Sequence, residues 1–215
     1  MTLVVIMAHK GVEEHCRRHM PFWQRQGSVV FFSPANLIVK MDAVTVWTYG
    51  PRGHHTPAAN QRFLAMLRFC AKTEADSFAV HEYDSVCFAQ VFGIPNDHLA
   101  GIAYSDTQPH RKFVGSTFVH PPLMFSKLVL TRVISALAGL KEQEAFMWDR
   151  WLGLGCERAG IPIFNLREHA LGFSKNTIEP GDIPAALHAI SNGACCFHGV
   201  KTKTVFDTLK LAGNW

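Results

Sequence analysis

Apolar residues in the first part of the chain form short runs separated by longer amphipathic stretches. The short runs are rich in β-branched and aromatic residues, which is typical of strands, and they cover residues 3–8, 29–32, 44–47 and 78–80. The longer stretches, 12–26 and 58–72, have the composition of helices, and Gly27 is suited to end the first of them. Strands that alternate with helices predict an α/β fold with a mostly parallel central sheet flanked by helices.

The pattern after residue 100 is less regular. We expect a strand over 112–120, a rigid turn at Pro121 and Pro122, and helices over 125–140 and about 144–159. A strand-like run at 194–197 and a last helix complete the chain. No repeat, low-complexity tract or linker interrupts this pattern. We therefore expect one compact unit over 1–215, made of one half at about 1–100 and another at about 101–215.

The composition agrees with a folded globular protein: 215 residues, 48% hydrophobic and 18% charged. A net charge of +4 suits an anionic ligand but is too small to establish nucleic-acid binding. No apolar run is long enough for a membrane span, and residues 1–6 lack the basic start of a signal peptide. The six cysteines show no paired framework, so we expect buried free thiols in a reducing cytoplasm.

Polar side chains follow several of the predicted strands, where ligands of parallel α/β sheets bind. His9, Ser33 and a Gly-rich loop at 50–55 occupy such positions, and Glu82 and Asp84 follow the strand at 78–80. Residues i and i+2 of a strand share a face, so both acids can point at one divalent cation. The alternative is a solvated turn in which Asp84 caps a following helix.

Two later segments also have residues suited to catalysis or metal binding. Asp149 lies in an aromatic-rich helix start, where desolvation would make it a general base; alternatively it pairs with Arg150 or with the helix end. His198 follows a strand and can ligate a metal, with Lys201 near enough to neutralise phosphate; alternatively it is a structural histidine. The group Cys195, Cys196 and His198 lacks the two-part spacing of a zinc site.

The order of these motifs resembles that of the GT-A-type nucleotide-sugar glycosyltransferases. In that family an acidic metal motif ends a strand, a Gly- or Pro-rich acceptor-side loop follows, then an acid at a helix start, and finally a histidine. Here the sequence 82–84 resembles the first element, 119–126 the loop, Asp149 the third and His198 the last. Two departures are the Glu at position 82 and the Trp at position 148, where an acid is usual, so Asp149 is assigned by position alone.

The resemblance implies a GT-A-like fold with a Rossmann-like nucleotide half and a smaller acceptor half. It implies that Asp84 and His198 hold Mn²⁺ or Mg²⁺ and that Glu82 binds the ion directly or through a water molecule. It also implies that Asp149 is the base of an inverting displacement. The remaining residues it would assign are, for the nucleotide-sugar donor, His9, Ser33, Tyr83 and Lys201, and, for the acceptor, His120 and Trp148. Arg62, with Asn60 at the start of the predicted helix over 58–72, is a further candidate to hold the pyrophosphate of a donor.

The acceptor class is open from sequence: a saccharide, a protein, or a hydroxylated base in DNA, as for small phage-type glucosyltransferases. Basic residues on the first predicted helix, Arg17, Arg18 and Arg25, favour a polyanion such as DNA, although they are equally suited to a solvated face. A nucleotidyltransferase, or a nucleotide- or nucleic-acid-binding module without catalysis, is the alternative function. A retaining mechanism would give Asp149 another role.

Overall fold

The computed structural model describes residues 1–42, 44–48, 57–105, 117–140 and 147–215. Within these residues the centre is a seven-stranded sheet in the order β3-β2-β1-β4-β7-β6-β8. Its strands are β1 (Thr2–Met7), β2 (Ser28–Ser33), β3 (Thr45–Thr48), β4 (Ser77–Glu82), β6 (Leu99–Ser105), β7 (Thr117–Ser126) and β8 (Ile163–Asn165). All of them run in one direction except β7, which is antiparallel to both of its neighbours. The sheet is therefore mixed but mostly parallel.

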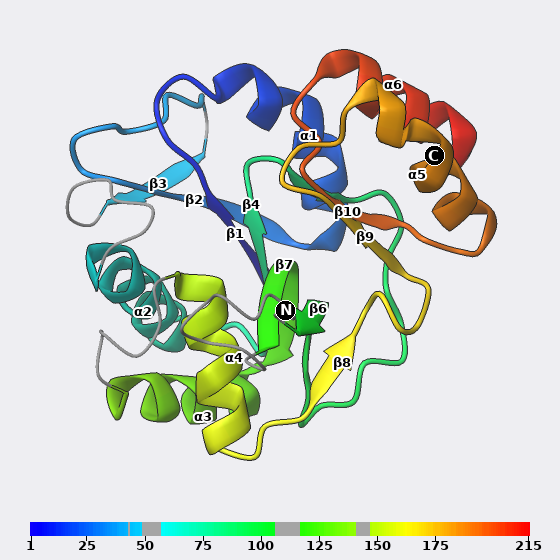
Figure 1. Ribbon diagram of the computed structural model, residues 1–215. Helices are drawn as coiled ribbons and strands as arrows, with labels where there is room; N and C mark the ends of the chain where they lie inside the picture. Colours follow the sequence, from blue (N-terminus) through cyan, green and yellow to red (C-terminus); the bar gives the residue numbers. More distant parts are fainter. Residues whose placement is uncertain (43, 49–56, 106–116, 141–146) are drawn as a thin grey trace.

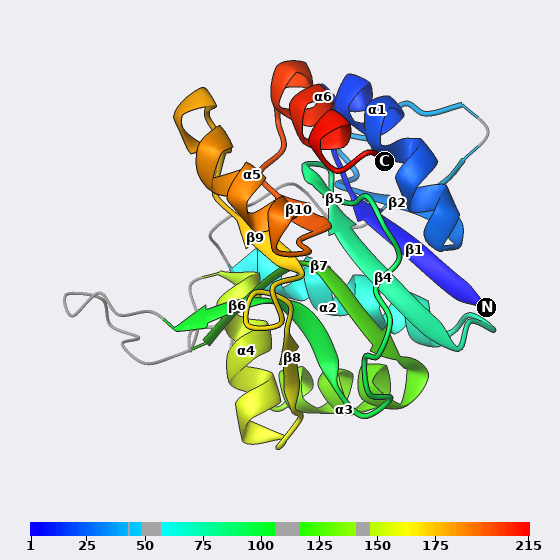
Figure 2. The ribbon, with the colours of Figure 1, turned by 90° about the vertical axis from the view of Figure 1, so that its right-hand side faces the viewer.

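Helices cover both faces of this sheet (Figure 1). One face packs against α2 (Pro57–Ala71), α3 (Lys127–Ala138) and α4 (Trp148–Arg158). The other face packs against α1 (Glu13–Gln26). On the α1 side lies a three-stranded sheet of β5 (Ser85–Cys87), β10 (Cys196–His198) and β9 (Gly172–Ser174), with η2 (Pro180–Asp182), α5 (Ile183–Ser191) and α6 (Lys203–Ala212) beside it (Figure 2).

The strands and helices expected before residue 85 are confirmed. In β1 the side chains of Val4, Val5 and Ile6 are fully buried, because both faces of this central strand are covered by helices. Val5 packs against the α2–α4 side and Val4 and Ile6 against α1. The expected loop at 50–55 lies outside the described residues.

The expected turn at Pro121 and Pro122, and the loop at 119–126, are wrong: these residues form part of β7. Proline lacks an N–H and normally interrupts a sheet ladder. Here the pairing of β7 with β4 stops at Leu123, and the register against β6 shifts over the same stretch. The prolines therefore lie where neither neighbour requires their N–H groups, which lets the strand continue through them.

Other boundaries differ in the second half. The helix expected over 125–140 begins at Lys127, because Phe125 and Ser126 end β7 and the Ser126 hydroxyl caps the helix by accepting a hydrogen bond from the Val129 N–H. The strands β5, β6 and β9 and the helix α5 were not anticipated, because the first three are short or lack alternation and α5 begins beside a proline.

Gly153 determines how closely α4 approaches the sheet. A Cβ at this position would lie 1.9 Å from the backbone oxygen of Thr117 in β7, so only glycine permits the observed contact. The close packing places the start of α4 over the residues of β7 that precede the prolines. No helix among the described residues is both long and apolar enough to cross a bilayer. All six cysteines are free and buried, as expected.

Candidate functional site

Glu82, Asp84 and His198 form a cluster in which one side-chain donor atom from each lies within 4.8 Å of the others. His198 Nε2 is 3.0 Å from Glu82 Oε2 and 3.8 Å from Asp84 Oδ1. Lys201 Nζ approaches the other oxygen of Asp84, at 3.5 Å. Residues separated by more than a hundred positions in sequence therefore meet at one point, at the carboxyl end of β4.

The two acids converge through a turn, not by alternation along a strand as we expected. The strand β4 ends at Glu82, Tyr83 and Asp84 form a turn, and β5 begins at Ser85. The Ser85 hydroxyl closes this turn, since it accepts a hydrogen bond from the Glu82 N–H and donates to the Glu82 carbonyl oxygen, both at 3.1 Å. No helix follows Asp84, so the helix-cap alternative is excluded.

The third member of the cluster arrives on β10, where His198 pairs with Ser85 across the small sheet. Beyond it, the N–H groups of Gly199 and Val200 donate to the Asp84 carbonyl oxygen at 3.1 and 2.9 Å. Gly199 has a φ of +91°, and a Cβ there would lie 2.1 Å from the Lys175 oxygen. The turn that carries Asp84 and the segment that carries His198 are thus tied together through the backbone.

Burial determines the electrostatics of the cluster. It raises the pKa of Asp84, which the Glu82 charge raises further, while His198 and Lys201 act in the opposite direction. Burial alone would lower the pKa of His198, but its hydrogen bond to Glu82 and the charge of Asp84 raise the pKa overall. Asp84 Oδ1 is buried and accepts no hydrogen bond. A buried acceptor of this kind is costly unless a cation or donor satisfies it.

The donor set fits a divalent cation. Two carboxylates and an imidazole can bind Mg²⁺ or Mn²⁺, and the unsatisfied Asp84 oxygen faces the same point as the other two donors. Glu82, Asp84 and His198 would hold such an ion after inward movements of their donor atoms, which lie within 4.8 Å of one another.

Asp149 lies at the start of α4 and is linked to this cluster through His120. Asp149 Oδ2 is 3.3 Å from His120 Nε2, and the rings of His120 and His198 lie 5.1 Å apart between centroids. Burial raises the pKa of Asp149 to about 6, and the charge of Glu82 acts in the same direction. Burial lowers the pKa of His120 to about 4, so its ring is neutral near pH 7. A carboxylate with a pKa near neutrality is suited to accept a proton.

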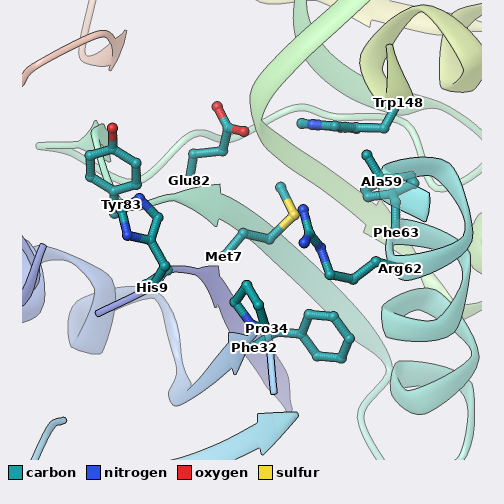
Figure 3. Close-up of a pocket in the computed structure, with 11 residues that line it drawn as sticks. Met7, His9, Phe32, Pro34, Ala59, Arg62, Phe63, Glu82, Tyr83 and Trp148 are labelled. Atoms are coloured by element: carbon teal, nitrogen blue, oxygen red, sulfur yellow. The ribbon is translucent and has the colours of Figure 1, made fainter. Parts of the chain in front are cut away.

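Several of the expected donor-binding residues surround a pocket at the ends of β1, β2 and β4 (Figure 3). His9 and Tyr83 lie on one side with their rings in edge contact, and Arg62 and Trp148 lie on the other. The carboxylate of Glu82 lies between the two sides, so the pocket adjoins the metal cluster. Its volume is about 60 Å³, so a whole nucleotide would extend beyond it.

Two expected positions differ from this arrangement. Ser33 is fully buried and does not line the pocket; its hydroxyl donates to the Ala8 carbonyl oxygen at 3.0 Å and accepts from the Val39 N–H. Trp148, expected on the acceptor side, stacks on Phe63 at 4.5 Å and lines the pocket together with Arg62.

Sequence reasoning missed two residues that contact the site. The Tyr104 hydroxyl lies 2.6 Å from His120 Nε2, and the Ser174 hydroxyl lies 3.2 Å from His198 Nδ1. Both stand on strands that lack a chemical motif, β6 and β9. Only the pairing of these strands with their neighbours brings the hydroxyls to the histidines, so no local signal could have identified them.

Comparison with known protein families and with curated proteins gave no match.

Proposed function

We propose that the protein is a metal-dependent glycosyltransferase that moves a sugar from a nucleoside-diphosphate sugar to an acceptor hydroxyl with inversion. Part of the donor would enter the pocket at the strand ends and the rest would extend beyond it, and the fold would be of the GT-A type. The meeting of Asp84 and His198, 3.8 Å apart although 114 positions separate them, supports this most strongly. The order of the motifs predicted that Asp84 and His198 share a metal site, and a large distance between the two side chains would have contradicted that prediction.

The position of Asp149 adds support. The third motif residue was assigned by its place in the sequence, and its carboxylate lies one imidazole away from the metal cluster. Its raised pKa keeps it ionised above about pH 6 and makes it basic enough to take a proton from a hydroxyl. His120 would hold the carboxylate in place, because its Nε2 contacts both Asp149 and the Tyr104 hydroxyl.

Glu82, Asp84 and His198 would hold the cation, which neutralises the charge of the leaving nucleoside diphosphate. Lys201 would add positive charge at the same place, since its ammonium group lies beside Asp84. Arg62, with Tyr83 and His9 across the pocket, would position the nucleotide. Asp149 would then remove the proton as the acceptor oxygen attacks the anomeric carbon, so that one bond forms while the bond to the diphosphate breaks.

The test is a thermal-shift screen of nucleoside diphosphates and nucleotide-sugars with and without Mn²⁺, followed by a turnover assay on the ligands that bind. A ligand that binds only the folded state raises the melting temperature. We expect Mn²⁺-dependent stabilisation, release of a nucleoside diphosphate and not of pyrophosphate, and loss of turnover in Asp149→Asn with donor binding retained. Absence of stabilisation by every nucleotide would contradict the proposal.

A further inference from the structure

A second cavity lies one side chain away from His120 and His198 of the proposed active site. Its volume is about 470 Å³, and its lining comes from β6, β9 and the segments beside them: Ile102, Tyr104, Arg167, Gly172, Phe173, Ser174, Lys175 and Asn176. β8 pairs with β6 here, and β9 of the small sheet also contacts β6 (Figure 2). Tyr104 and Ser174 line the cavity and also contact His120 and His198. Ser174 therefore lies between the cavity and His198 of the metal cluster, whereas Tyr104 and His120 lie between the cavity and Asp149.

The charged residues that line this cavity are all cationic. Among the described residues that line it, Arg167 and Lys175 are cationic and none is acidic. Lys175 has a partner in Asp182 at 3.3 Å, whereas the guanidinium of Arg167 has no acid within 4.0 Å in the described part of the chain. An arginine without an acidic partner at a cavity mouth is suited to bind a carboxylate or phosphate in bidentate fashion.

The backbone at Arg167 is held firmly on the sheet. Its N–H donates to Asn165 Oδ1 at 3.1 Å, and the Asn165 amide also bridges the N–H and carbonyl groups of Ala103 in β6, both at 3.0 Å. Asn165 is buried. The side chain of Arg167 thus extends from a fixed backbone position beside β6, and its exposed guanidinium reaches the cavity.

The remaining lining suits a sugar. The ring of Phe173 offers an apolar surface, while the Ser174 hydroxyl and Asn176 amide offer hydrogen bonds. The Tyr104 ring is stacked on Phe118 and His120, so its hydroxyl is the part suited to contact a sugar. A cavity of this volume accommodates one or two sugar units, not a nucleic-acid duplex. The arginines of α1 pack in another layer, with Arg25 over the ring of Phe22.

We propose that this cavity binds the acceptor, and that the acceptor is an anionic saccharide whose phosphate or carboxylate is recognised by Arg167. The inference rests on the proposed glycosyltransferase function and specifies its acceptor. The reacting hydroxyl of the bound sugar would take the place of the Tyr104 hydroxyl beside His120, from where it would reach Asp149, with the donor on the opposite side of the metal cluster.

The test is a set of calorimetric titrations without metal or nucleotide, using glucose, glucose 6-phosphate, glucuronate and a single-stranded oligonucleotide. The variants are Arg167→Gln and, as a control with the same charge change, Arg25→Gln on the exposed side of α1. We expect one or both charged sugars to bind at least tenfold more tightly than glucose, and the phosphate and carboxylate probes show which anion is preferred. Arg167→Gln should remove this preference and Arg25→Gln should keep it.

Equal binding of glucose and both charged sugars, no binding of any sugar, or equal loss in the two variants would overturn the proposal. Oligonucleotide binding that Arg25→Gln weakens and Arg167→Gln does not would also overturn it, because the acceptor would then be a nucleic acid held at α1. Stabilisation of Arg167→Gln by Mn²⁺ and nucleoside diphosphates is measured in parallel. This stabilisation should equal that of the native protein, because Arg167 does not contact the metal or the donor. Failure of the acceptor proposal would leave it unchanged, whereas failure of the proposed function would abolish it in both proteins.

Discussion

Replacing Asp84 by Asn should have opposite effects on the metal-free and metal-bound protein. The raised pKa of Asp84 means that the folded protein disfavours the charge of this buried carboxylate, despite Lys201 at 3.5 Å and His198 at 3.8 Å. Without metal, Asp84→Asn should therefore be at least as stable as the native protein. Metal should not stabilise the variant, because the asparagine amide lacks the negative charge with which the Asp84 carboxylate binds a cation.

The size of the metal effect follows from linkage. A cation at about 100 times its dissociation constant stabilises the folded state by about 2.7 kcal/mol. For a chain of this length that corresponds to a rise in melting temperature of roughly 5–10 °C. We expect this rise for the native protein with Mn²⁺ and almost none for Asp84→Asn, measured by circular dichroism at pH 7.5.

The matched control is Asp97→Asn, which removes an exposed carboxylate remote from the cluster. It should keep the full response to Mn²⁺. The reasoning would be refuted if Asp84→Asn kept that response too, or if Asp84→Asn alone lowered the melting temperature of the metal-free protein by many degrees. The second result would mean that the carboxylate has a structural role.

Turnover should fall as the pH drops through about 6, because Asp149 then gains a proton; a rate–pH profile checks this. The pKa of Asp149 is higher in the folded protein than in the unfolded chain, so ionisation of this carboxyl destabilises the fold as the pH rises from about 4 to 6. The free energy of unfolding of Asp149→Asn, measured by urea titration, should therefore exceed that of the native protein by up to about 3 kcal/mol at pH 8, with no such difference at pH 4. Gly153→Ala should destabilise the fold by about 1–3 kcal/mol, since its Cβ would clash with the Thr117 backbone, whereas Gly139→Ala, with no atom closer than 3.6 Å, should not. Lys201→Met should lower the rate of sugar transfer about tenfold or more with little change in Mn²⁺ response, because the ammonium group is absent from the donor set; equal loss of both would contradict that role.

The first half of the fold could be predicted because its signals are local. Runs such as Val4, Val5 and Ile6 are buried on both faces and must be apolar throughout, so the strands are visible in the sequence. The second half depends on pairing between distant segments. Pro121 and Pro122 indicated a turn, and only the register of β7 against its neighbours shows why a strand passes through them.

The candidate site was predictable to a similar extent. Asp84, Asp149 and His198 could be selected because their residue types and positions after strands or at a helix start suit the chemistry. The distances between these side chains could not be predicted, because they depend on the turn at Tyr83 and on the pairing of His198 with Ser85. Tyr104 and Ser174 are recognisable only by their distance to the histidines, because neither belongs to a sequence motif.

The pairing of β5 with β10 has a consequence for biosynthesis. Glu82 and Asp84 leave the ribosome long before His198, and the small sheet that unites them needs β9 and β10 as well. A nascent chain that stops before residue 198 carries two adjacent carboxylates without their third partner. Its first four strands are able to pair while the chain grows, but the cation site is completed only after translation of nearly the whole sequence.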